Sequence, residues 1–140
     1  MSQENVETVR RAYERLAEGD PLGDWTWFFE EFAHDDLELR PAGTYLDAVP
    51  SYQGREGWAQ FWREFSSVWE EWRFDPAAFE FFDAGERVVV FARAVGIGKG
   101  SGVEVTQDEA HLWTIRDGRM LLATSYMDRA EALEAVGLSE

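Results

Sequence analysis

One amphipathic pattern limits the folds open to this chain more than any other feature of its sequence. Between Arg55 and Trp72, large apolar side chains recur every three or four residues, which is the spacing of one face of an α-helix. These side chains are Trp58, Phe61, Trp62, Phe65, Val68, Trp69 and Trp72. A face this wide and aromatic has to be buried, so the pattern predicts a helix over 55–72 that packs against a broad apolar surface.

The rest of the chain supplies such a surface. Runs rich in β-branched and aromatic residues, separated by turn signals, predict an antiparallel meander with strands at 74–82, 87–95, 103–115 and 119–127. Weaker patterns predict helices over 6–17, 25–32 and 128–137, a short strand at 37–39 and an irregular segment at 43–54. Helices at one end of an antiparallel sheet make an α+β fold, and with no linker or repeat we expect a single domain over 1–140.

The glycine-rich stretch GIGKGSGVEV, residues 96–105, raises the question of a phosphate-binding loop. Such a loop needs GxGxxG or GxxxxGK[ST] spacing followed by a helix, because the helix N-terminus meets the anion. Neither spacing is present, and the residues that follow favour a strand. We therefore expect a hairpin tip, where glycine supplies a positive φ or lets another group approach the backbone closely.

Composition argues against several classes of partner. The formal net charge of −15 disfavours nucleic acid and anionic membrane surfaces, whose binding needs clustered Lys and Arg. No run approaches the roughly 20 apolar residues of a membrane-spanning helix, and we expect a cytoplasmic protein. The chain has no cysteine and no EF-hand or His-x-x-x-His spacing, so we expect no metal site and no cofactor.

Four segments, taken in order, resemble the nuclear transport factor 2-like superfamily, in its branch of SnoaL-like polyketide cyclases and ketosteroid isomerases. They are YERLAEGD (13–20), FAHDDLELRPAG (32–43), YQGREGWAQFWREF (52–65) and HLWTIRDGRM (111–120). The resemblance implies a cone-shaped fold, in which a strongly curved antiparallel sheet wraps the long helix and leaves an apolar pocket. It also implies a homodimer through the outer face of the sheet, because runs such as 88–91 would place apolar side chains on both faces of a strand.

The resemblance identifies positions at which relatives keep catalytic groups. The general-base Asp of the isomerases falls on Arg40, which cannot accept a proton at neutral pH. The isomerase acid falls on His111 when counted from the apolar residues that follow it, or on Ala110 when counted from the front of the turn. Alternation along the strand favours His111, because it then shares a face with Trp113.

Two further positions complete the comparison with these relatives. The Asp that hydrolases and cyclases hold in the last strand falls on Ser125, which cannot act as a comparable base. The oxyanion tyrosine of the isomerases falls one residue from Tyr13. We therefore take His111 as the candidate for proton transfer, with Tyr13 or Arg40 as candidates for stabilising an oxyanion.

Two classes of function remain open. The pocket is expected to be lined by Trp58, Trp62, Trp113 and Ser125 and to accept a small, mostly apolar, oxygenated molecule. In the first class the protein is an enzyme that transfers a proton without a cofactor, as an isomerase, cyclase or hydrolase. In the second it is a non-catalytic binding module of the same fold.

Overall fold

The computed structural model describes residues 2–41, 51–126 and 128–138. In chain order the elements are α1 (Ser2–Glu18), α2 (Thr26–Glu31), β1 (Ala33–Arg40), β2 (Tyr52–Gln53), α3 (Gly54–Ser66), β3 (Trp69–Phe74), the 3-10 turn η1 (Pro76–Ala78), β4 (Glu80–Ala84), β5 (Arg87–Gly98), β6 (Glu104–Arg116), β7 (Arg119–Tyr126) and α4 (Arg129–Glu134). This order confirms the α+β class. Most of the segment expected to be irregular, and the last residue of the strand expected at 119–127, lie outside the described residues.

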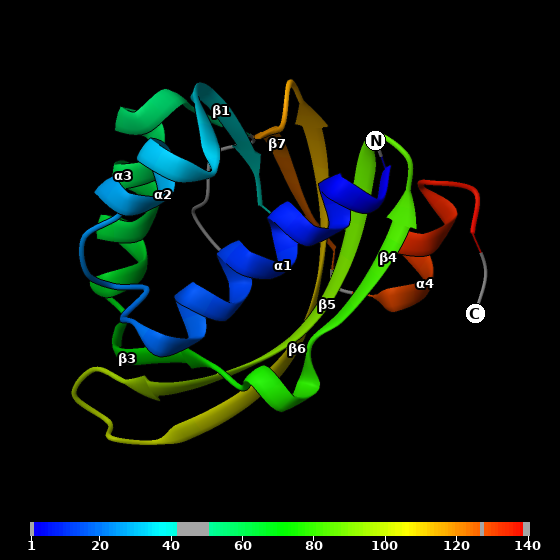
Figure 1. Ribbon diagram of the computed structural model, residues 1–140. Helices are drawn as coiled ribbons and strands as arrows, with labels where there is room; N and C mark the ends of the chain where they lie inside the picture. The colour runs from blue at the N-terminus through cyan, green and yellow to red at the C-terminus, as the bar shows by residue number, and fades with distance from the viewer. Residues whose placement is uncertain (1, 42–50, 127, 139–140) are drawn as a thin grey trace.

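The strands form one strongly curved sheet in the order β2-β1-β7-β6-β5-β3, with β4 also paired to β5. All pairs are antiparallel except β1 with β7, which is parallel. Figure 1 shows β5 and β6 bending beneath the helices, with α1, α2 and α3 on the concave side and α4 on the other side. The cone-shaped fold is thereby confirmed, and the parallel pair closes one side of the cone with an early strand.

The helix predicted over 55–72 ends earlier than expected, at Ser66. Beyond it, Trp69–Phe74 is strand β3, antiparallel to β5, so the helical prediction is wrong for Val68, Trp69 and Trp72. The hydroxyls of Ser66 and Ser67 donate to the carbonyls of residues three positions earlier, which competes with continuation of the helix. Pairing with β5 then satisfies the backbone of the residues that follow.

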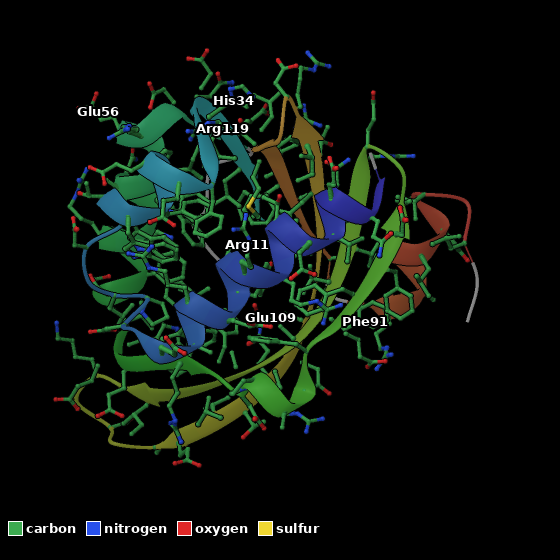
Figure 2. The ribbon with its side chains drawn as sticks, viewed as in Figure 1. Arg11, His34, Glu56, Phe91, Glu109 and Arg119 are labelled. Carbon is green, nitrogen blue, oxygen red and sulfur yellow. The ribbon has the colours of Figure 1, made fainter. Side chains whose placement is uncertain are left out.

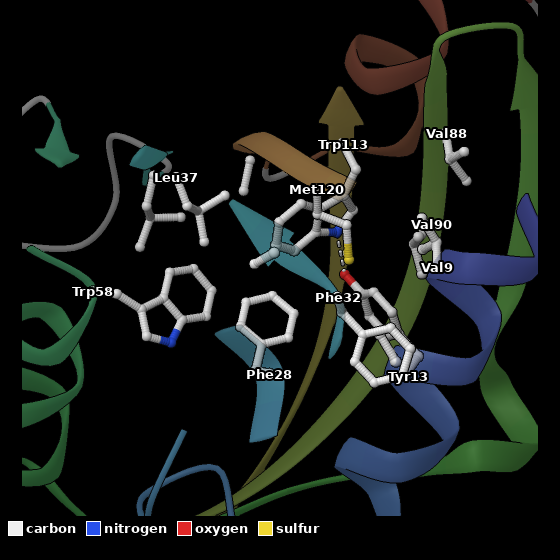
Figure 3. Packing of buried hydrophobic residues seen from close by; sticks show 14 of the residues in the cluster. Val9, Tyr13, Phe28, Phe32, Leu37, Trp58, Val88, Val90, Trp113 and Met120 are labelled. Atoms are coloured by element: carbon white, nitrogen blue, oxygen red, sulfur yellow. Dashed lines mark hydrogen bonds between the residues drawn. The ribbon is translucent and has the colours of Figure 1, made fainter. Parts of the chain in front are cut away.

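The aromatic face of α3 packs on the concave side, as predicted. Trp58 is buried, and Phe61, Trp62 and Phe65 are partly buried against the same core. Figure 3 shows Trp58 on α3 opposite Phe28 of α2, with Trp113 and Met120 of the sheet nearby. Burying one large apolar side chain contributes about 1.5–3 kcal/mol, so this face anchors α3 to the sheet.

A second apolar cluster lies on the outer face of the sheet. Val89, Phe91, Ala110 and Leu112 pack there beneath Ala132 and Leu133 of α4, and Phe91 is labelled beside α4 in Figure 2. Part of the apolar surface that led us to expect a homodimer is thus covered within the chain. The homodimer stays a prediction.

The glycine-rich stretch forms the tip of the β5–β6 hairpin, as predicted. Gly100 and Gly102 have φ of +85° and +68°, which glycine adopts without strain. Gly96 instead lies against the Trp72 ring. Within the described residues, no helix is both long enough and apolar enough to span a membrane.

Candidate functional site

A cavity lies between the concave face of the sheet and helices α1 to α3. Its aromatic lining consists of Tyr13, Trp25, Trp27, Phe28, Trp58, Phe61, Trp62, Phe65, Trp72, Phe74 and Trp113. The space open to the centre of a water molecule is about 70 Å³. One water needs roughly 10–15 Å³ on that measure, so the cavity has room for several waters or one small organic molecule.

Four polar side chains of the cavity form one chain of hydrogen bonds. Glu109 Oε1 lies 2.9 Å from His111 Nε2, and His111 Nδ1 lies 2.6 Å from the Tyr13 hydroxyl. The indole Nε1 of Trp113 donates to the same hydroxyl at 2.7 Å, a bond drawn as a dashed line in Figure 3. Glu109 and Tyr13 are buried and only 14% of the His111 side chain is exposed, so the chain lies almost entirely out of solvent.

The donors and acceptors along this chain follow from elementary chemistry. An ionised Glu109 can only accept, so Nε2 of a neutral His111 carries the ring proton and Nδ1 accepts from the Tyr13 hydroxyl. Burial raises the pKa of Tyr13 far above its ordinary value; the hydrogen bond from Trp113 lowers that pKa and the charge of Glu109 raises it further. The phenol therefore keeps its proton.

Alternation along β6 decides which residues reach the cavity. Glu109, His111 and Trp113 line it, whereas Ala110 belongs to the outer cluster beneath α4. Of the two positions considered for the isomerase acid, only that of His111 is on the concave face. Ser125 of β7 is directly opposite His111 in the β6–β7 register and also lines the cavity.

The candidate residues divide into two groups by position. Tyr13, His111, Trp58, Trp62, Trp113 and Ser125 all line the cavity. Arg40 does not: it lies at the end of β1, its side chain is 53% exposed, and its Nε donates to Glu38 at 2.9 Å. A guanidinium in that place is not positioned to contact a molecule in the cavity.

Two features of the site were missed in the sequence. The first is Glu109, which strand alternation could have revealed, because a residue two positions before His111 lies on the same face of the strand. The other feature is the pair of indole nitrogens of Trp58 and Trp62, which are buried without a hydrogen-bond partner in the described structure. A buried unpaired donor costs about 1–3 kcal/mol, so these two N–H groups are suited to an acceptor that the chain itself does not supply.

Metal-binding geometry is absent from the part of the chain that the structure describes. No group of three or more His, Cys, Asp or Glu side chains is arranged there to hold an ion. Among the described residues that line the cavity, the acidic side chain is Glu109, whose carboxylate bonds to His111 and, at 3.3 Å, to Gln107.

Comparison with known proteins identifies the family. A model of the SnoaL-like domain matches residues 9–122, and no curated protein matches the chain. Among solved structures, TerC co-crystallised with polyporic acid is 25% identical, with a TM-score of 0.70 over 95% of this chain and 98% of that one.

Two other structures share the fold at lower identity. A putative SnoaL-like polyketide cyclase from Jannaschia sp. CCS1 is 21% identical, with a TM-score of 0.70 over 99% of this chain and 95% of its own. A protein with a ketosteroid isomerase-like fold from Catenulispora acidiphila DSM 44928, in complex with trimethylamine, is 18% identical, with a TM-score of 0.65 over 95% and 94%. These confirm the nuclear transport factor 2-like fold, and because the family model matches well over half of the residues, the chain belongs to the SnoaL-like domain family.

Proposed function

We propose that this protein binds a small, mostly apolar, oxygen-bearing molecule in the cavity and moves a proton on it without a cofactor. The observation that carries the proposal is the buried chain Glu109–His111–Tyr13 in an otherwise aromatic cavity. A histidine changes its charge near neutral pH, which suits it to take up and return a proton. Its two neighbours assist this role: Glu109 places a negative charge at Nε2, and Tyr13 places a hydroxyl at Nδ1.

The proton moves by a relay through Tyr13. A C–H bond next to the carbonyl of the bound molecule breaks, its proton passes to the Tyr13 oxygen, and the phenol proton passes to His111 Nδ1. The electron pair of the broken bond goes to the carbonyl oxygen as an enolate, and Glu109 stabilises the imidazolium. Return of the proton to another carbon of the molecule gives an isomerisation. If the enolate carbon instead attacks a second carbonyl carbon of the same molecule, the C=O π bond breaks, the proton returns to that oxygen, and the product is cyclic. Because the two transfers occur together, no phenolate forms, which agrees with the raised pKa of Tyr13.

The unpaired indole donors support an oxygen function on the ligand. The indole N–H groups of Trp58 and Trp62 are buried and lack a partner within the described chain, so each is a donor for an oxygen of the ligand. The 25% identical TerC was co-crystallised with polyporic acid, so a relative of this fold has been captured with a small organic molecule. Both observations favour a carbonyl- or hydroxyl-bearing ligand over a hydrocarbon.

Cyclopentanone in D₂O tests the proposal, because exchange of its α-hydrogens for deuterium reports proton transfer directly by NMR. We expect the wild-type protein to accelerate this exchange and the H111Q variant to lose the acceleration while it still binds the ketone. Gln keeps much of the shape and hydrogen bonding of His but cannot transfer a proton at neutral pH. Unchanged exchange in H111Q would assign the chemistry to another residue.

A non-catalytic binding module is the second candidate, and a specific observation favours it. The position of the isomerase base is occupied by Arg40, which is turned away from the cavity and paired with Glu38. For this candidate we expect cyclopentanone to bind to the wild-type protein without any acceleration of deuterium exchange.

A further inference from the structure

We propose that the charge of His111 decides which hydrogen-bonding group Tyr13 offers to a molecule in the cavity. With a neutral imidazole the site selects a ligand that donates a hydrogen bond, and with a protonated imidazole it selects a ligand that accepts one. This inference deepens the proposed function and rests on the same cavity.

The argument begins with the capacity of the Tyr13 oxygen. A phenol has one hydrogen to donate and two lone pairs that accept. The Trp113 indole can only donate, so its bond at 2.7 Å occupies one lone pair permanently. His111 Nδ1, at 2.6 Å, occupies a second of the three positions. One position is left, and Tyr13 lies in the cavity wall.

In the neutral state the remaining position is an acceptor. Glu109 holds the ring proton on Nε2, so Nδ1 must accept, and the Tyr13 hydrogen is directed at it. What is left on the phenol oxygen is a lone pair. A hydroxyl or N–H group of a ligand can then bond to Tyr13, whereas a carbonyl oxygen meets another oxygen.

Protonation of His111 reverses this polarity. Both ring nitrogens are then donors, so Nδ1 donates to Tyr13 and occupies its second lone pair. The phenol hydrogen is released from His111 and becomes available to the cavity. A carbonyl or enolate oxygen can now accept from Tyr13, and a donor group meets another hydrogen. One proton on the ring changes the preferred ligand without movement of the backbone.

The groups around His111 determine which proton in the site can change. Glu109, two residues earlier on β6, and Tyr13 of α1 are the other titratable residues among the described residues that line the cavity. In the part of the chain that the structure describes, the neighbours on adjacent strands carry no charge: Val90 of β5, Ser125 of β7 and Phe74 of β3. Tyr13 keeps its proton because burial opposes the phenolate. Of these three groups, the imidazole is therefore the one whose proton switches the site.

Three five-membered rings of similar size test the inference. Pyrrole donates a hydrogen bond, cyclopentanone accepts one, and cyclopentane does neither. Dissociation constants are measured by tryptophan fluorescence above and below the midpoint of the His111 ring titration, which NMR assigns by comparison with H111Q. We expect the affinity ratio of pyrrole to cyclopentanone to fall at least about fivefold from the neutral to the protonated state, since each gained or lost hydrogen bond changes affinity by about that factor.

The variant Y13F is the matched control, because it keeps the ring and removes the switching group. Its affinity ratio of pyrrole to cyclopentanone should not change with pH. A ratio that stays constant across the wild-type titration, or a His111 ring that keeps one charge state from about pH 5 to 8, overturns the inference. If the cyclopentanone exchange assay nevertheless depends on His111, the proposed function stands without it. If none of the three rings binds, both fall.

Discussion

Replacement of Gly96 by alanine should destabilise the side of the cavity where β5 meets β3. A Cβ at Gly96 would lie 2.6 Å from Cε3 of Trp72 and 2.8 Å from Cε3 of Trp69. The Trp72 ring is buried and packs edge-on against Phe65, with 4.6 Å between ring centroids, so it cannot yield without disturbing a second ring. Overpacking of this kind costs about 1–3 kcal/mol. For a domain of this size the unfolding midpoint should fall by roughly 3–15 °C.

Thermal unfolding followed by circular dichroism measures the effect, and G19A serves as the control. A Cβ at Gly19 would make only an ordinary contact, 3.7 Å from the Arg15 carbonyl oxygen, and Gly19 is not among the glycines with positive φ. Its free energy of unfolding should change by no more than about 0.5 kcal/mol. A G96A midpoint equal to that of the wild type would refute the argument that the tryptophan rings require glycine here. Equal losses in both variants would instead indicate a general effect of replacing glycine.

Three further predictions concern the site and the assembly. The Y13F variant should lose about 1–3 kcal/mol of unfolding free energy in urea, because the buried Trp113 N–H loses its acceptor; an unchanged value would contradict the 2.7 Å bond. The hydrogen bond from the Arg40 guanidinium, and after it the one from the Ser51 hydroxyl, hold the pKa of Glu38 below its usual value. These bonds therefore stabilise the folded protein above the ordinary pKa of Glu, and their contribution is lost as the pH falls through the lowered pKa of Glu38. R40Q should therefore be about 0.2–1 kcal/mol less stable than the wild type near pH 7 and equal to it at strongly acidic pH, with unchanged affinity for cyclopentanone; equal stability at both pH values would contradict the role of the pair. Sedimentation at micromolar concentration should show a homodimer, and a single species near 16.1 kDa would count against it.

The order of the elements could be predicted because it depends on periodicities that each segment carries by itself. Two exceptions are the strand expected at 74–82, which the 3-10 turn η1 divides between β3 and β4, and the end of α3, where Val68, Trp69 and Trp72 continue the helical spacing of the residues before them. The same residues lie on or beside a strand that pairs with β5, more than twenty positions further along the chain. Local spacing cannot reveal that competition, because the backbone bonds that decide it come from a distant segment.

The candidate site shows the same limit more sharply. Alternation placed His111 beside Trp113, and one more step of the same rule would have added Glu109. The contact between Tyr13 and His111 joins residues 98 positions apart, and nothing in either segment alone predicts it. Arg40 could be aligned with a catalytic position, but alternation along β1 places it on the face opposite to the buried Leu39, where it pairs with Glu38.

The place of Glu109 in this cavity has a physical implication of its own. An ionised carboxylate among aromatic rings is unfavourable unless hydrogen bonds replace the water it loses. Here His111 and Gln107 bond to it, and the His111 ring is in turn held by Tyr13, whose hydroxyl also accepts from Trp113. An apolar residue at 109 would satisfy the core without any of these partners, so folding does not require a carboxylate at this position. Sites where local chemistry departs from what folding alone would favour are where function is concentrated. The same bonds that make Glu109 tolerable also orient the imidazole and fix its tautomer, and that is the arrangement which a proton relay through Tyr13 requires.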